Sequence, residues 1–171
     1  MGDRTSAILH HLAATRAELL DAVSGLGDDD WDRRIASDEG AWAIRQLLAH
    51  VASAEPGQLA TGRRMLAGEA RLGDGFSLDV WNRRQVEKLK DRSPAELLSD
   101  LSASRQTLLA WIAGLSDTDL DKSGQHARGD FITVEQLCYR IGEHEAGHAE
   151  QILAALARPQ VRASQAGGAP T

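Results

Sequence analysis

Two histidines near the C-terminal end of the sequence have the spacing of metal ligands. His144 and His148 are four residues apart, in a segment whose apolar residues recur every three or four positions. In an α-helix this spacing places both imidazoles on one face, about one turn apart, where they can bind the same ion. The periodicity also places both on the face of the helix that we expect to be buried, where imidazoles need polar partners. The pair therefore predicts a site for one divalent metal ion.

The segment His144-Glu145-Ala146-Gly147-His148 also matches the H-E-x-x-H motif of zinc proteases. Those enzymes need a third ligand further along the chain, and no histidine follows His148. The extended metzincin motif would require a histidine at position 154, which is alanine. Glu150 lies too close along the same helix to complete the usual site. These observations argue against a protease.

The third ligand must then come from another part of the chain, where four further histidines are available. His10 and His11 point away from the apolar face of their own predicted helix, so we expect both to face solvent. His126 lies in a glycine-containing loop, where a ligand role and a structural role are both open. His50 flanks an apolar helical stripe and has small residues on its own face, which leaves room for an ion between helices. The pattern alone favours His50, although this residue lies off the centre of its stripe.

The elements that must position these residues are helices, because helical periodicity recurs along the chain and strand-like alternation is nearly absent. Pro56 lacks a backbone donor, so we expect a kink or a break near Glu55 in the second helix. The glycines at 68, 73 and 75 predict a loop after it. The other predicted helices run from Thr5 to Ser24, from Ser77 to Arg92, from Ser93 to Gly114 and from Thr133 to Arg158.

Several of the predicted helix ends carry capping signals. Gly25 can adopt the left-handed conformation that ends a helix. Ser93-Pro94-Ala95-Glu96 combines an N-cap, a proline at the first helical position and a capping box, and Thr133 with Gln136 forms a second box. These signals favour an all-α protein, and we predict an antiparallel four-helix bundle.

A faint internal repeat supports this arrangement. The same order of features occurs twice in the sequence: a Gly-Leu pair, an acidic turn and the start of a helix. The first copy consists of Gly25-Leu26, its acidic turn and the segment 42–47, and the second of Gly114-Leu115, its acidic turn and the segment 132–137. Two stacked helical hairpins would produce such a repeat. The predicted bundle domain covers residues 1–158, and residues 159–171, which are rich in small side chains, are predicted to form a disordered tail.

The composition excludes several classes of function. The formal net charge is −6 at pH 7 and no basic cluster stands out, which argues against a nucleic-acid partner. The N-terminal residues lack the apolar stretch of a signal peptide, and no apolar run reaches the roughly 18 residues of a membrane span. We therefore expect a cytoplasmic protein without a membrane partner. Cys138 is the one cysteine, which excludes an internal disulfide and a cysteine-rich zinc site.

The segment Trp42-Ala43-Ile44-Arg45-Gln46-Leu47-Leu48-Ala49-His50-Val51, with a late helix carrying His-x-x-x-His, resembles the DinB/YfiT-like superfamily. The resemblance extends over nearly the whole chain, to about residue 157. It implies a four-helix bundle in which one histidine of the second helix and two of the fourth hold a divalent metal, and these match His50, His144 and His148. Such bundles are often dimeric, so a homodimer is one possible assembly. The serine or threonine that often follows the tryptophan is Ala43 here, which weakens a helix cap and leaves the ligands in place.

Three neutral imidazoles leave coordination positions open, as in catalytic sites, and they suit zinc or nickel without a choice between them. Such an ion can acidify bound water or activate a thiolate. Relatives implied by the resemblance include mycothiol-dependent maleylpyruvate isomerase and bacillithiol or mycothiol S-transferases, which use a thiol. We therefore predict a metal-dependent enzyme that adds a low-molecular-weight thiol to a small electrophile. The alternatives are a metal-dependent hydrolase and a metal-binding stress or scaffold protein without turnover.

Other polar side chains have two interpretations each. Glu145 could accept a hydrogen bond from a ligand or act as a base, but a surface salt bridge is the favoured interpretation. Glu55 could orient a ligand or merely precede the break at Pro56. Cys138 and Tyr139 are interpreted as packing residues. Two pairs of arginines occur, at Arg63-Arg64 and Arg83-Arg84. They could bind substrate carboxylates, although such pairs are most often solvated.

Overall fold

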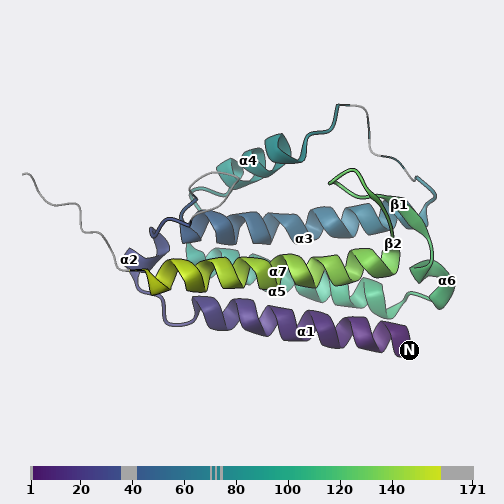
Figure 1. Ribbon diagram of the computed structural model, residues 1–171, viewed down its shortest axis with the longest axis horizontal. Helices are drawn as coiled ribbons and strands as arrows, with labels where there is room; N and C mark the ends of the chain where they lie inside the picture. The colour runs from purple at the N-terminus through teal and green to yellow at the C-terminus, as the bar shows by residue number, and fades with distance from the viewer. Residues whose placement is uncertain (1, 36–41, 70, 72, 74, 159–171) are drawn as a thin grey trace, which may run out of the picture.

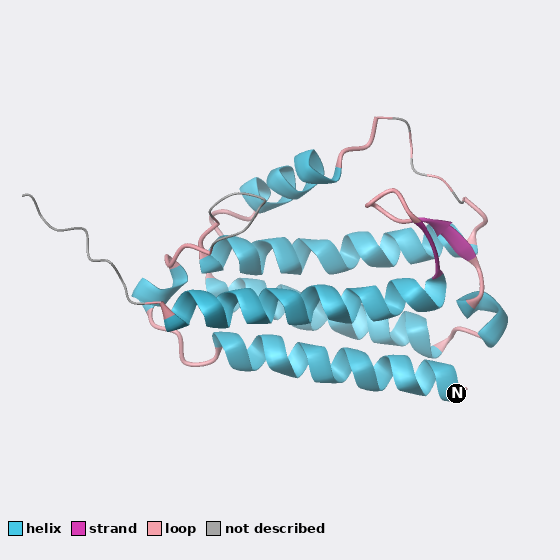
Figure 2. Cartoon of the chain, viewed as in Figure 1, coloured by secondary structure: helices cyan, strands magenta, loops and turns pink. Residues whose placement is uncertain are grey.

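The computed structural model describes residues 2–35, 42–69, 71, 73 and 75–158. In this part of the chain the four long helices lie side by side, and a shorter helix covers the outside of one of them (Figures 1 and 2). The elements are α1 (Asp3–Val23), α2 (Asp28–Trp31), α3 (Ile44–Leu66), α4 (Leu78–Lys88), α5 (Pro94–Ala113), α6 (Asp117–Leu120), β1 (Ser123–Gln125), β2 (Phe131–Thr133) and α7 (Val134–Ala157). The predicted all-α four-helix bundle is confirmed. The predicted tail, 159–171, lies outside the described residues.

The order of the long helices around the bundle determines which side chains can meet. Helix α1 lies against α7, α3 lies against α5, and α7 also contacts α3. Within the first two pairs the helices run in the same direction, and the two pairs run opposite to each other (Figure 1). The contact between α3 and α7 brings the second and fourth long helices together. None of the helices in the described ranges is long and apolar enough to traverse a lipid bilayer.

The internal repeat of the sequence is visible in the order of the elements, but the prediction of two stacked hairpins is wrong, because α1 lies against α7 and α3 against α5. Each half consists of a long helix, a short acidic helix, a pair of antiparallel extended segments and a second long helix. The extended pair is a single bridge between Arg34 and Ala43 in the first half, and the hairpin β1–β2 in the second. In both halves a glutamine side chain, Gln46 or Gln136, accepts a hydrogen bond of 2.9 Å from the backbone N–H of the residue that caps the next helix.

Helix α3 continues through Pro56 to Leu66, so of the predicted kink or break near Glu55, the break is wrong. The proline removes one backbone hydrogen bond, but the residues around it are buried between neighbouring helices. Ala54 is 8% exposed, Glu55 2% and Leu59 7%. Tertiary packing therefore outweighs the local preference of the proline.

The hairpin β1–β2 was not predicted from the sequence. Each strand has only three residues, too few for an alternating pattern to be recognised, and Gly124 pairs with Ile132 at its centre. The sequence predicted a loop in this region, and the structure has the hairpin after α6 instead.

The core consists of two apolar clusters, one at each end of the bundle. One cluster contains Leu19, Leu48 and Leu101 together with neighbours from all four long helices. The other lies toward the opposite ends of the same helices and contains Leu12, Leu108 and Leu137. Four buried charged residues, one from each long helix, lie along the helices between the two clusters, and we call them the charged layer: Arg16, Glu55, Arg105 and Glu145.

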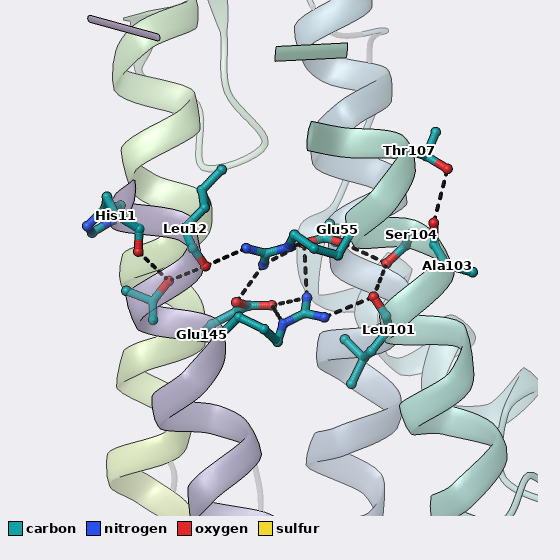
Figure 3. A network of polar contacts seen from close by, with 11 residues as sticks. His11, Leu12, Glu55, Leu101, Ala103, Ser104, Thr107 and Glu145 are labelled. Carbon is teal, nitrogen blue, oxygen red and sulfur yellow. Dashed lines mark hydrogen bonds and ion pairs between the residues drawn. The ribbon is translucent and has the colours of Figure 1, made fainter. Parts of the chain in front are cut away.

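The charged layer is a closed ring of ion pairs, in which each arginine contacts both glutamates (Figure 3). Arg105 Nη2 lies 2.6 Å from Glu145 Oε2 and 2.7 Å from Glu55 Oε2. Arg16 Nη1 also donates to the carbonyl oxygen of Leu101 at 2.9 Å. Buried charges require such compensation, because desolvation of an unpaired charge is costly. The prediction of a surface salt bridge for Glu145 is therefore wrong: its carboxylate is 2% exposed and paired inside the bundle.

Candidate metal centre

Three histidines from two helices converge where α3 contacts α7. Nε2 of His50 lies 3.1 Å from Nε2 of His144, and Nε2 of His148 lies 3.1 Å from the same atom. One nitrogen from each of the three residues lies within 4.8 Å of the others. The three candidates selected from the sequence are therefore neighbours in the fold.

This convergence fits a shared cation better than a set of hydrogen bonds. A ring nitrogen offers either one hydrogen or one lone pair in the plane of the ring, so Nε2 of His144 can satisfy only one of its two neighbours well. Three lone pairs directed at one ion would satisfy all three rings. Bonds of about 2.0–2.1 Å at tetrahedral angles separate ligand nitrogens by about 3.3 Å, which is close to the observed spacing. The donor set and its geometry thus suit a divalent ion.

The three imidazoles differ in burial. His50 is buried, at 4% exposure, whereas His144 and His148 are half-buried. The sequence analysis placed both α7 histidines on the buried face of the helix, and this prediction is wrong by about one position. The buried position is that of Glu145, which belongs to the charged layer. The buried face of α7 contains Ile141, Glu145, Ala149 and Ile152. Both histidines lie at its edge, where a ligand can reach them.

Burial keeps two of the rings uncharged. It lowers the pKa of His50 to about 3, and a positive charge on His148 would lower it further. Burial likewise lowers the pKa of His144 well below its usual value, with smaller contributions from His148 and His50. Neutral imidazole is the form that binds a metal.

The orientation of His148 is determined by its own helix. Oε1 of Gln151 lies 2.9 Å from Nδ1 of His148. An amide oxygen only accepts hydrogen bonds, so the proton is on Nδ1 and Nε2 keeps its lone pair. Contacts of this type fix the tautomer and the ring orientation of metal ligands.

The three histidines line a cavity of about 540 Å³. One wall is aromatic and is formed by Trp42 just before α3, Phe76 just before α4 and Trp81 in α4. The centroid of the Trp42 ring lies 5.2 Å from that of the His50 ring. The turn of the hairpin β1–β2 forms another part of the lining. A cavity of this size with a few polar groups is typical of small-molecule sites. Its aromatic and charged lining residues are Trp42, Phe76, Trp81, Arg128 and Glu143.

The other histidines lie outside the convergent group. His10 is exposed, as expected, but the same expectation is wrong for His11. Nε2 of His11 lies 3.1 Å from the carbonyl oxygen of Tyr139, and the ring fits against α7 because Gly142 has no side chain there. His126 is buried in the hairpin turn and lines the cavity.

None of the paired arginines lines the cavity, whose described lining contains Arg128 instead. Arg64 donates to the carbonyl oxygen of Gln125 at 2.8 Å, so it holds the hairpin against α3. Burial raises the pKa of the Cys138 thiol to about 12, in agreement with its predicted packing role. Sequence reasoning did not find Arg128, because its position depends on the unpredicted hairpin.

The sequence and the fold are similar to those of known proteins over most of the chain. Residues 11–152 match the sequence profile of the DinB superfamily. The uncharacterized protein YuaE of Bacillus subtilis (strain 168) is 25% identical over 154 residues, which cover 80% of this chain and 90% of that protein.

Two solved structures show the same fold. YfiT from Bacillus subtilis, described as a probable metal-dependent hydrolase with an unusual four-helix bundle topology, matches with a TM-score of 0.71 at 19% identity, over 91% of this chain and 90% of that one. The mycothiol-dependent maleylpyruvate isomerase matches with a TM-score of 0.71 at 12% identity, over 89% of this chain and 63% of that one. At these identities the likeness establishes the fold alone.

Proposed function

Because the chain belongs to the DinB superfamily, we propose that His50, His144 and His148 hold a divalent metal ion beside a small-molecule site. The observation that carries this proposal is the convergence of three Nε2 atoms on one side of the cavity. Three imidazole ligands suit zinc or nickel and leave a coordination position for a substrate. A bound ion of this kind supplies Lewis acidity, which favours deprotonation of a water or a thiol at neutral pH.

The side chains of the cavity have separate tasks in this proposal. Gln151 fixes the orientation of His148, and the aromatic residues exclude water and pack against the apolar part of a substrate. Glu143 is the one carboxylate among the described residues that line the cavity, so it is the group available to accept a proton there. The paired arginines have no part in binding.

For the reaction, we favour transfer of a low-molecular-weight thiol to a small electrophile. Two observations support it: the likeness to an isomerase named as mycothiol-dependent, and a cavity large enough for two small reactants. Hydrolysis is the second candidate. It is supported by the likeness to YfiT, described as a probable metal-dependent hydrolase, and by the position of Glu143 at the cavity.

The metal content of purified protein tests the first part of the proposal. Wild-type protein should hold about one zinc or nickel ion per chain by elemental analysis, and His144→Ala should lose it. His10→Ala is the matched control, since His10 is exposed and does not belong to the convergent group, and it should keep the metal. Equal metal content in both variants would refute the assignment.

Turnover separates the two reactions. A model electrophile with a low-molecular-weight thiol should be conjugated only by metal-loaded protein, and a chelator should abolish the reaction. Ester hydrolysis that persists without thiol and is lost with the metal would favour the hydrolase. Metal-loaded protein that does neither, with the metal retained, would favour a binding protein without turnover.

A further inference from the structure

The turn between β1 and β2 forms part of the cavity wall and contains a histidine that the proposed function does not use. His126 is only 5% exposed, although turn residues are usually solvated. Its backbone N–H donates to the carbonyl oxygen of Asp130 at 2.8 Å, and Gly129 N–H donates to the carbonyl oxygen of His126 at 2.8 Å. Gly129 has a φ of 98°, which favours glycine. The imidazole thus occupies a fixed place in the wall.

The hydrogen bonds of the His126 ring determine its tautomer. The backbone N–H of Arg128 lies 3.2 Å from Nδ1, and Nη1 of Arg140 lies 3.1 Å from the same atom. A backbone amide and a guanidinium can only donate, so Nδ1 accepts. Asp130 holds the Arg140 guanidinium in place through contacts of 2.8 and 3.0 Å. The proton of the neutral ring must therefore be on Nε2.

The ring stays neutral near pH 7. Burial and the positive charge of Arg140 lower the pKa of His126 to about 4, against an opposing effect of Asp130. Nε2 has no hydrogen-bond partner in the described part of the chain, and His126 belongs to the lining of the cavity. The Nε2–H group is therefore available to donate a hydrogen bond to a ligand in the cavity.

A second donor lies beside it. Arg128 lines the same cavity, and none of the ion pairs between described residues includes it. The remaining wall contains Trp42, Phe76 and Trp81. A cavity lined by an imidazole N–H, a guanidinium and flat apolar side chains matches a molecule that has a carboxylate at one end and an apolar body.

We propose that His126 Nε2–H and Arg128 bind the carboxylate of a small organic acid, whose apolar part lies against the aromatic wall. This inference rests on the proposed function in one respect, namely that the reacting end of the acid faces the three convergent histidines. Arg140 is a positioning residue, because it acts on the ligand through the tautomer of His126.

Calorimetry with benzoate and benzyl alcohol tests the inference, since the two probes have similar bodies and differ in the carboxylate. Wild-type protein should bind benzoate at least 10-fold more tightly than benzyl alcohol. The preference should persist after zinc is removed with a chelator, because the carboxylate binds to the protein. Loss of benzoate binding together with the zinc would show that the carboxylate is a metal ligand, which would overturn the inference.

Two variants assign the preference to the turn. His126→Phe keeps a ring and removes Nε2–H, and Arg128→Ala removes an exposed side chain without disturbing the fold. Each should weaken benzoate binding about 10-fold and leave benzyl alcohol unchanged. His126→Gln returns an N–H donor near the position of Nε2 and should restore part of the affinity. Arg83→Ala, an exposed arginine that does not line the cavity, is the matched control. Wild-type affinity in both His126→Phe and Arg128→Ala would refute the assignment.

The positioning role of Arg140 has its own readout. In ¹⁵N NMR spectra of wild-type protein, Nδ1 of His126 should be unprotonated and Nε2 protonated. Arg140→Met should mix the two tautomers and weaken benzoate binding several-fold, and a pure Nε2–H form in this variant would exclude the role. Zinc stoichiometry is measured in every sample. Protein that holds no zinc yet prefers benzoate would refute the metal proposal and leave this inference intact.

Discussion

Oε1 of Gln151 lies 2.9 Å from Nδ1 of His148, one turn further along α7. The contact holds the imidazole in the tautomer whose Nε2 faces His144 and His50. We therefore expect Gln151→Leu to weaken zinc binding by about 10–100-fold, the usual effect of removing such a partner. Competition with a chromophoric chelator measures the change. Gln58→Leu is the control, because Gln58 lines the same cavity from α3. Unchanged zinc affinity in Gln151→Leu would contradict the proposed role.

Removing one member of the charged layer should lower the free energy of unfolding strongly, because it leaves buried charges without partners. Arg105→Met removes the guanidinium that contacts both Glu55 and Glu145, and leaves Arg16 alone with two buried carboxylates. We expect the free energy of unfolding in urea to fall by about 3–5 kcal/mol. Lys90→Ala breaks an exposed ion pair with Glu87 and should change it by less than about 1 kcal/mol. Similar small effects of both substitutions would mean that the layer is not held by its charges.

Stability should fall on acidification because His126 is buried in its neutral form. The pKa of His126 is about 4 in the folded protein and 6.5 ordinarily, so between these values the unfolded chain binds more protons. The contribution lost from pH 6.5 down to pH 4 is at most about 3 kcal/mol. Urea unfolding in chelator at successive pH values should give a shallower decline for His126→Phe than for wild type. Asp130, Arg140 and Arg128, which face the ring, are retained in the variant. Parallel curves would disprove the expectation.

Two helical glycines should respond to alanine with opposite signs. A Cβ at Gly147 would meet no atom within 4 Å, so Gly147→Ala should raise the free energy of unfolding by about 0.5–1 kcal/mol through helix propensity. A Cβ at Gly62 would lie 2.5 Å from the ring of Trp111, so Gly62→Ala should lower it by about 1–3 kcal/mol through overpacking. Chemical unfolding of the two variants checks the difference in sign, and an equal response would contradict it.

The helices could be predicted from the sequence because their signals are local. Ser93, Pro94 and Glu96 form the predicted cap of α5, and Thr133 with Gln136 forms that of α7. Such caps depend on four consecutive residues and need no knowledge of the fold. The proximity of His50 to the α7 histidines is different in kind. It depends on the packing of α3 against α7, which no local signal encodes; the pattern favoured His50 only slightly, and the family resemblance was the main reason to select it.

The charged layer could not be predicted in the same way, although its spacing was present in the sequence. Arg16 follows Leu12 by four residues and precedes Leu19 by three, and Arg105 stands in the same relation to Leu101 and Leu108. Both arginines therefore occupy positions of the apolar stripe. A charge at such a position can be buried only if partners arrive from other helices, and that is a property of the assembled bundle. The sequence does not decide between a ligand role and a structural role for His126 for the same reason, since its burial depends on the hairpin.

The separation of the core by the charged layer has a consequence for protein engineering. Leu19 and Leu108 belong to different apolar clusters, with the layer between them. Substitutions in different clusters share no packing partner, so their effects should add, whereas substitutions within one cluster should be coupled. A designer can therefore repack one end of the bundle without optimising the other again. The two ends are independent design problems joined by four side chains.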